Sequence, residues 1–258
     1  MGQADGVILR LKDQGEYDQV LTLITKDGPL RGIAKGAKRS IRRFGGRIET
    51  LNRVTVEYTR KKEGSLAVLK ESVLTEYFEH IPENLIALAR CLYLGEFIEA
   101  SQGEGEGMFN LYLGFLRRAN AGKATEEIFR LTELKLLAYL GYCPSLSRCA
   151  SCGESISGKA RFSFSKGGSL CPRCQGKESL SAGRSHPEIS LETIRALEKG
   201  LGLKDKVLDR LKFSKKSLLE AHEIFPAFIR YTLERDLKSL RFIEKIANYD
   251  LPGTDKKA

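Results

Sequence analysis

Four cysteines in the middle of the chain form two Cys-x-x-Cys pairs, Cys149 with Cys152 and Cys171 with Cys174, and eighteen residues separate the pairs. Each Cys-x-x-Cys turn presents two thiolates to one metal ion, and Zn²⁺ prefers four nitrogen or sulfur ligands in a tetrahedron. Two such turns that close a short β-loop form a zinc ribbon. The spacing therefore predicts a Zn²⁺ site made by all four cysteines.

The predicted metal has a structural role. When all four ligands are protein thiolates, no coordination position remains open for water or a substrate, so a catalytic zinc is not expected. A module of this size has little core of its own, and the ion would hold it together. Phe162 and Phe164 are assigned to that small core in preference to a nucleic-acid surface. Cys91 is assigned to a helical core, and Cys143 and His186 to packing and surface positions.

The first part of the chain, residues 5–77, has the pattern of β-structure. Five short segments are β-branched or alternate apolar with polar residues, and turn residues such as Asp27-Gly28-Pro29 separate several of them. Five short strands in roughly seventy-five residues suit a small closed barrel better than an open sheet.

Helical periodicity replaces the strand pattern after Pro82. Apolar residues then recur at steps of three and four, which predicts helices before the cysteines and again from Pro187 onwards. The predicted fold is therefore multidomain α+β, with a β-barrel followed by an α-helical domain that carries an inserted zinc ribbon with four cysteine ligands. The expected domains are a barrel over residues 1–79, a helical domain over 80–148 and 183–248, the ribbon over 149–182, and a flexible tail over 249–258.

The chain carries a net charge of +10, and much of it is concentrated between residues 31 and 62, where eleven Lys or Arg residues stand against two acidic ones. Contacts to phosphates supply most non-specific affinity for nucleic acid, and glycines let a loop follow a backbone closely. Phe44 and Tyr58 are candidate stacking residues, and the alternative is a solvated basic loop. The candidate DNA-binding residues are Arg31, Lys35, Lys38, Arg39, Arg42, Arg43 and Arg47.

Several catalytic and targeting motifs are absent from the sequence. The residues from Gly32 lack the spacing of an ATP-binding phosphate loop, and His222-Glu223 is not followed by the second histidine of a protease-type zinc helix. With three histidines and no Ser/His/Asp arrangement, an enzyme is not expected. No apolar run is long enough to span a bilayer and the N-terminus has no signal-peptide core, so a cytoplasmic location is expected.

The order of these features resembles the RecO family of bacterial recombination mediators. The resemblance spans nearly the whole chain and is most specific at Ala34-Lys35-Gly36-Ala37-Lys38-Arg39 and at Leu140-Gly141-Tyr142, which leads into the first cysteine pair. It implies an N-terminal OB-fold, a helical body and, in members that keep the cysteines, a zinc finger.

The resemblance carries over to some candidate residues and not to others. Lys35, Lys38 and Arg39 match the family's basic barrel motif, and the four cysteines match its zinc ligands. The later cations Arg42, Arg43 and Arg47 are added from charge alone.

The resemblance implies a function in DNA repair and recombination. RecO-like proteins bind single- and double-stranded DNA without sequence preference and anneal complementary strands without ATP. With RecR they help to load the recombinase, RecA, onto DNA coated with single-strand-binding protein (SSB). They hold the acidic C-terminal tail of SSB through the helical domain, and Arg130 is the candidate contact here. A bacterial, cytoplasmic and nucleoid-associated protein is implied, with no membrane and no small-molecule substrate.

Two other functions fit parts of the sequence. A zinc-ribbon adaptor on the transcription or translation machinery would bind DNA only incidentally and would co-purify with those machines. A zinc-dependent nuclease or deaminase requires an open metal site, and the all-cysteine ligand set argues against it.

Overall fold

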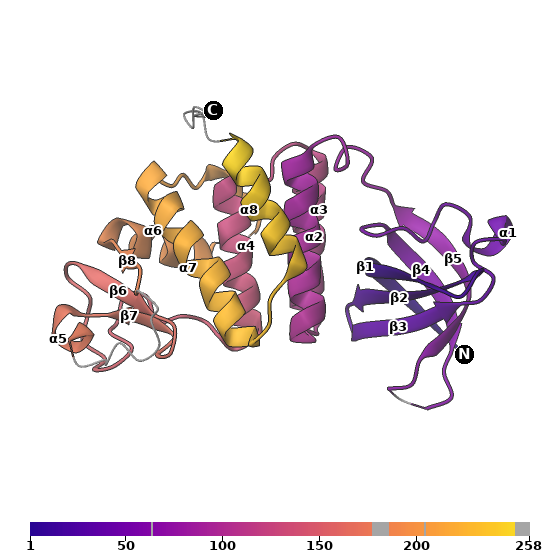
Figure 1. The fold of residues 1–258 in the computed structure, drawn as a ribbon, viewed down its shortest axis with the longest axis horizontal. Coiled ribbons are helices and arrows are strands. Elements are labelled where there is room, and N and C mark those ends of the chain that lie inside the picture. The colour runs from indigo at the N-terminus through magenta and orange to yellow at the C-terminus, as the bar shows by residue number, and fades with distance from the viewer. Residues whose placement is uncertain (63, 177–185, 204, 251–258) are drawn as a thin grey trace, which may run out of the picture. The chain divides into compact units, whose positions relative to one another are not determined.

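The computed structural model describes residues 1–62, 64–176, 186–203 and 205–250. Contacts divide the chain into two compact units (Figure 1): residues 1–122 together with the C-terminal helix α8 (Lys238–Asp250), and residues 123–235. The predicted border between ribbon and helical domain at residues 182 and 183 lies outside the described residues, as do residues 251–258 of the predicted tail. The domain borders therefore stay predictions. In the described residues, no helix combines the length and the apolar character that crossing a membrane requires.

A closed five-stranded barrel forms the N-terminal part of the first unit, as predicted. Its strands are β1 (Gly2–Gln14), β2 (Asp18–Thr25), β3 (Gly28–Ala34), β4 (Arg53–Thr59) and β5 (Ala67–Glu76). The order around the barrel is β1-β2-β3-β5-β4, and β4 closes onto β1. All neighbouring strands are antiparallel except β3 and β5, which run parallel. The five predicted segments are these five strands, and the barrel is OB-like.

Alternation along the strands fills the barrel. Side chains two residues apart point to the same face of a strand, so Leu21 and Leu23 on β2 both face inward, as do Val54 and Val56 on β4. All four are fully buried. Burial of such a side chain contributes about 1.5–3 kcal/mol, which makes this interior the main stabilising element of the barrel.

Three helices complete the first unit: α2 (Leu85–Ser101), α3 (Glu106–Asn120) and α8. Helix α2 contacts α3, α8 and strand β1. The Asn84 side chain caps the start of α2 by accepting a hydrogen bond from the backbone N–H of Ala87. Cys91 is fully buried on α2, as predicted, and its carbonyl accepts a hydrogen bond from Tyr112 on α3.

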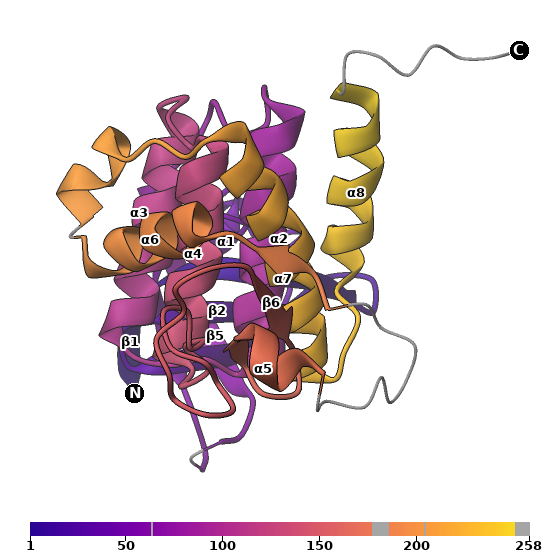
Figure 2. The same ribbon diagram turned by 90° about the vertical axis from the view of Figure 1, so that its left-hand side faces the viewer.

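The second unit combines three long helices with a small sheet. The helices are α4 (Glu126–Tyr139), α6 (Leu191–Gly202) and α7 (Lys215–Leu233), with the 3-10 helix η1 (Asp205–Arg210) between the last two. The sheet has the order β7-β6-β8, from β6 (Ala160–Ser163), β7 (Gly168–Leu170) and β8 (Glu188–Ile189). The short helix α5 (Pro172–Gln175) contacts β6 and β7, and Figure 2 shows it beside β6.

The expected helix start at Pro187 is wrong by four residues. Residues 188–189 pair with β6 instead, and the carbonyl of Pro187 accepts a hydrogen bond from Phe162. Helix α6 begins at Leu191 because the Ser190 side chain accepts a hydrogen bond from the backbone N–H of Thr193.

A chain of ion pairs runs across one end of the barrel to α3. Asp5 on β1 lies 2.6 Å from Arg53 on β4, and Arg53 lies 3.5 Å from Glu76 on β5. Arg117 on α3 donates two hydrogen bonds to Glu76, at 2.9 and 2.7 Å. These bonds from Arg117 are the main reason that the pKa of Glu76 lies below its ordinary value of 4.5.

We expect part of the acid sensitivity of the fold to come from Glu76. Because its pKa is lower in the folded than in the unfolded chain, its contribution is complete above pH 4.5 and is lost as the pH falls through the folded value. Glu76→Gln should lower the free energy of unfolding by about 1–2 kcal/mol at pH 7, and by progressively less as the pH falls below 4.5. Urea unfolding across pH 7 to pH 3.5 measures this. The control is Glu71→Gln, an exposed carboxylate on the same strand; an equal loss at every pH would contradict the assignment.

Candidate metal centre and nucleic-acid interface

The four cysteine sulfur atoms lie together, all within 4.8 Å of one another. The Sγ atoms of Cys152 and Cys171 are 3.8 Å apart, and a tetrahedron with Zn–S bonds of about 2.3 Å has edges of about 3.8 Å. The spacing predicted this cluster from the sequence, and the structure brings all four residues into it. The arrangement can hold one metal ion with four thiolate ligands.

Two backbone turns position these sulfurs. After the first pair, the N–H of Gly153 donates to the carbonyl of Cys149 at 2.8 Å, and Gly153 takes a φ of +76°, which favours glycine. After the second pair, the N–H of Cys174 donates to the carbonyl of Cys171 at 2.9 Å. The N–H of Ala150 donates to a carbonyl of β7 and so holds the two turns side by side.

The surroundings of the cluster shift the pKa values of two of its thiols in opposite directions. Burial disfavours the thiolate of Cys149, but backbone N–H groups of Cys171 and Cys152 donate to its sulfur and lower its pKa to about 6. The pKa of Cys174 is raised to about 12, first by its hydrogen bond with the sulfur of Cys152 and then by burial. A metal ion would bind all four sulfurs as thiolates, so metal binding would release the protons that the thiols carry.

The aromatic residues of the ribbon are buried, as predicted, but the core they form is shared with a helix. Phe162 is fully buried, and its ring meets that of Phe228 on α7 edge-on with the ring centres 5.2 Å apart. Phe164 lies against Tyr231 on the same helix at 6.4 Å. These faces are therefore closed to nucleic-acid bases. Cys143 is exposed and outside the thiol cluster.

The basic loop between β3 and β4 covers one end of the barrel, and a short helix, α1 (Ile41–Phe44), interrupts it (Figure 1). Phe44 is 1% exposed and belongs to the barrel core together with Ala37 and Ile48 from the same loop. Phe44 was a candidate stacking residue, and that expectation is wrong because the ring is inside the barrel. Tyr58 packs at the edge of the same core.

Two cations of the loop are held against the β1–β2 hairpin. The ammonium of Lys38 lies 2.6 Å from the carboxylate of Asp13, and this contact is the main cause of the lowered pKa of Asp13. The guanidinium of Arg39 lies over the ring of Tyr17 at 3.3 Å from its centre, a cation–π contact. The backbone N–H of Lys38 also donates to the carbonyl of Tyr17. Both exposed cations therefore have defined positions.

The remaining loop cations divide into two kinds. Lys35 and Arg42 are exposed, and Arg43 is exposed while donating hydrogen bonds to Ser40 and to the carbonyl of Lys35. Arg47 is half-buried, and its guanidinium donates to the carbonyl oxygens of Arg42 and of Ser72 on β5. Arg47 thus ties the loop to the barrel, a structural contact that its charge did not reveal.

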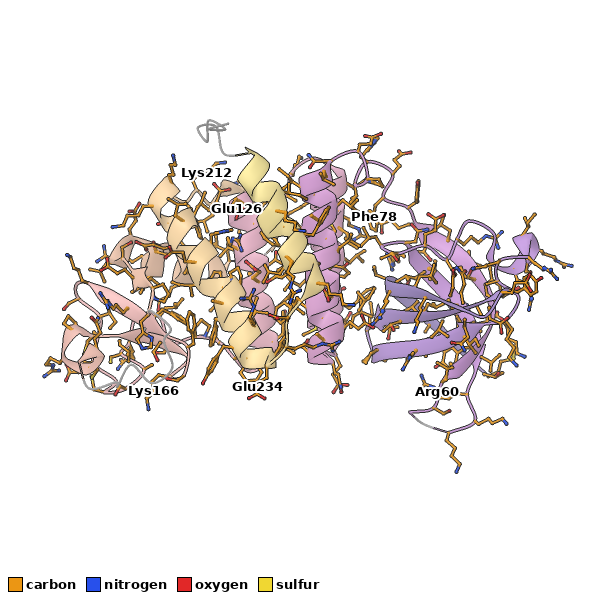
Figure 3. The ribbon with its side chains drawn as sticks, in the orientation of Figure 1. Arg60, Phe78, Glu126, Lys166, Lys212 and Glu234 are labelled. Carbon is orange, nitrogen blue, oxygen red and sulfur yellow. The ribbon has the colours of Figure 1, made fainter. Side chains whose placement is uncertain are left out.

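A second basic segment lies at the β4–β5 turn, where Arg60 is labelled in Figure 3. Arg60, Lys61 and Lys62 follow the end of β4, and the two lysines are exposed. Because Gly32 on β3 pairs with Ala67, the first residue of β5, the turn ends beside the predicted contact Arg31. These three cations could have been added to the candidates from the sequence, because the loops of an OB-like barrel line the binding groove of the barrel.

Arg130 lies inside the second unit and not on its surface. Its side chain is 2% exposed, and it donates hydrogen bonds to Glu126 and Glu133 at 2.7 Å each. A third donor nitrogen lies 2.8 Å from Nδ1 of His222 on α7. To reach an acidic tail, this guanidinium would have to leave two carboxylates. The proposed function therefore does not rely on Arg130.

Comparison with known proteins identifies one family along the chain. The family model described as "Recombination protein O N terminal" matches residues 1–78, and "Recombination protein O C terminal" matches residues 82–241. The DNA repair protein RecO of Geobacter sulfurreducens is 32% identical over 95% of this chain and 98% of its own length. The RecO of Pelotomaculum thermopropionicum is 31% identical over 94% and 93%. The RecO of Roseiflexus sp. is 30% identical over 95% and 85%.

We expect the thiol cluster to bind about one zinc ion per chain. Replacing Cys149 and Cys152 by Ala should abolish that binding and lower the unfolding temperature by about 5 °C or more, because the ribbon loses its cross-link. Metal analysis and thermal unfolding measure the two effects. Cys143→Ser, an exposed cysteine outside the cluster, is the matched control. Unchanged zinc content in the double variant would contradict the site, and loss of DNA binding in a fully folded variant would contradict a purely structural role.

Proposed function

The chain belongs to the RecO family, and from this premise we propose that it is a recombination mediator in DNA repair. It binds single- and double-stranded DNA without sequence preference and anneals complementary strands without ATP. The observation that carries the proposal is the array of exposed cations on the loop that closes the barrel. In that loop Lys35, Lys38, Arg39, Arg42 and Arg43 are exposed.

Electrostatics accounts for annealing without a nucleotide. Two single strands repel each other through their phosphates, and bound cations screen that repulsion. The buried ring of Phe44, which we call the plug, and the hydrogen bonds of Arg47 hold the backbone of the loop in place. The loop therefore loses little conformational entropy when DNA binds. Base pairing then supplies the free energy of annealing. No reaction step requires a catalytic side chain, and the protein acts as a mediator and not as an enzyme.

A phosphate that binds Lys38 has to compete with the ion pair between Lys38 and Asp13. Lys38 is shared with Asp13, and a phosphate that approaches Lys38 also meets this carboxylate. Arg39 is exposed while its guanidinium lies over the ring of Tyr17, and Arg42 is exposed. Arg39 and Arg42, which have no carboxylate partner among the ion pairs described, are therefore stronger candidates for phosphate contact than Lys38. The proposed binding surface continues from the basic loop along β3 to Arg31 and the β4–β5 turn. Arg31 lies on β3, four residues before the loop begins at Lys35, which is about 13 Å along a strand.

The four thiolates would hold a Zn²⁺ ion with a structural role. All four ligand positions are taken by Cys149, Cys152, Cys171 and Cys174, so the ion would supply a cross-link to the ribbon. The ribbon already rests on α7 through Phe162, and the ion would cross-link the two cysteine turns, the first of which bonds to β7.

The proposed partners follow from the family. With RecR, the protein helps to load RecA onto single-stranded DNA coated with single-strand-binding protein. It recognises the acidic tail of that protein through its helices, in the bacterial cytoplasm at the nucleoid. The rival, a zinc-ribbon adaptor for the transcription or translation machinery, would not need a cation array on the barrel.

We expect the loop cations to set the salt dependence of DNA binding. The variant with Lys38, Arg39, Arg42 and Arg43 all changed to Ala should bind single strands weakly. Its plot of log affinity against log salt should lose about 3 units of slope, because each phosphate contact contributes about 0.7. Fluorescence anisotropy at several salt concentrations measures both. Arg47 stays in place because it holds the loop.

The control for that variant is the change of Lys212, Lys215 and Lys216 to Ala, three exposed lysines in the second unit. It lowers the net charge by a similar amount without touching the barrel. Equal loss of slope in both variants would mean that total charge, and not the loop, determines binding.

We expect annealing of complementary strands coated with single-strand-binding protein to proceed without ATP and to depend on the acidic tail of that protein. Fluorescence-quenching annealing assays compare intact single-strand-binding protein with a form that lacks the tail. Fast annealing only with the intact form supports the mediator. No annealing with either form would contradict it and favour the adaptor.

A further inference from the structure

One large apolar side chain stands out among the loop cations. Ile41 is 84% exposed, and apart from the N-terminal Met1 no other large apolar residue in the described part of the chain is so exposed. A single exposed apolar residue is ordinary on a protein surface. Ile41, however, has Arg39 two positions before it and Arg42 and Arg43 directly after it. An apolar group thus projects from the surface where phosphates are proposed to bind.

The backbone on both sides of Ile41 is fixed to the barrel. Phe44, three residues later, is 1% exposed inside the barrel, and its N–H donates to the carbonyl of Ser40. The N–H of Gly45 donates to the carbonyl of Ile41 at 3.0 Å. A Cβ atom at Gly45 would lie 2.6 Å from that carbonyl oxygen, so only glycine allows the chain to close so tightly over the start of α1.

Side-chain hydrogen bonds hold the next turn of the loop. The hydroxyl of Ser72 on β5 donates to the carbonyl of Arg43, and Arg47 donates to the carbonyl of Arg42 and to β5. Ile41 is therefore presented at a defined point on a braced loop. The barrel core does not need its side chain, since Phe44, Ala37 and Ile48 fill the opening.

Cations and an apolar group side by side match the two faces of a single strand. Phosphates lie along one edge of the strand and bases along the other. When Arg42 and its neighbours hold the phosphates, an apolar group beside them is placed to meet bases. Isoleucine is among the side chains that proteins insert between bases, where it replaces base–base stacking by contact with the protein.

We infer that Ile41 is a base-contacting wedge, which inserts between neighbouring bases of the DNA strand held by the basic loop and unstacks them. This inference rests on the proposed function. Unstacking would help annealing, because bases released from stacks and hairpins expose their pairing edges to a complementary strand. The same wedge acts on any sequence, since every base has an apolar face.

The experiment uses the full chain and a short single strand that carries 2-aminopurine, whose fluorescence rises when the base is unstacked. The wild-type protein is expected to raise the fluorescence at saturation. Ile41→Ala should lose most of that rise while its dissociation constant changes by less than about threefold, because phosphate contacts supply most of the affinity. Ile41→Leu should keep the rise.

Ile41→Lys separates a wedge from a phosphate contact. It adds a cation at the same place, so it should bind DNA at least as tightly as the wild type and yet produce no rise in fluorescence. Leu219→Ala, which truncates a 57% exposed leucine on α7, is the matched control and should behave as the wild type. Ile41 is exposed, so its variants are expected to fold, and thermal unfolding checks this.

The outcomes distinguish this inference from the proposed function. A full rise in fluorescence with Ile41→Ala or with Ile41→Lys would overturn the wedge and leave the DNA-binding loop intact. If the wild type bound DNA with a normal salt slope and produced no rise in 2-aminopurine fluorescence, the wedge would likewise be overturned and the DNA-binding loop would stand. If the wild type bound no single-stranded DNA, the proposed function and the wedge would fail together.

Discussion

The burial of Phe44 in the open end of the barrel is the contact on which the functional surface depends. A phenylalanine in such a position is worth about 3–5 kcal/mol, and here it anchors, together with Ala37 and Ile48, a loop that is rich in cations and glycines. Mutual repulsion would spread these cations apart. The buried Phe44 ring and the hydrogen bonds of Arg47 to Arg42 and Ser72 instead fix the loop that carries them to the barrel. The same anchor leaves Ile41 outside, so one buried ring positions both the charged and the apolar parts of the surface.

The thiol cluster and the basic loop have different proposed roles, one in stabilising the fold and one in binding DNA. The ribbon is a small sheet whose aromatic residues rest on α7, and its remaining cross-link comes from four sulfurs placed for a tetrahedral ion. No phenylalanine is exposed in its described residues, and four thiolate ligands would leave no open coordination position on an ion. The loop, in contrast, offers exposed cations whose positions are set by Asp13 and Tyr17 of the neighbouring hairpin. The proposed role of a metal in the cluster is therefore structural, and the proposed role of the barrel is to bind an anion.

Local sequence patterns, such as residue alternation and the spacing of the cysteines, predicted most of the fold. Strand alternation located all five barrel strands, and the two Cys-x-x-Cys pairs located the thiol cluster, because the alternation can be read along each strand and each pair spans four residues. The start of α6 was misplaced because residues 188–189 pair with β6, more than twenty residues away. Arg130 and Arg47 were treated as surface cations for the same reason. Their partners His222 and Ser72 lie 92 and 25 residues away in the chain.

The sequence by itself determined the barrel, the helical periodicity, the ligand set of the ribbon and the place where positive charge accumulates. Each follows from residue type and local spacing, which the chain carries in any environment. Only the tertiary structure decided which charged and aromatic side chains remain at the surface. Burial depends on what distant segments bring to a position, and so Phe44 became a plug, Arg130 joined a buried ion cluster, and Ile41 stayed exposed beside Arg42.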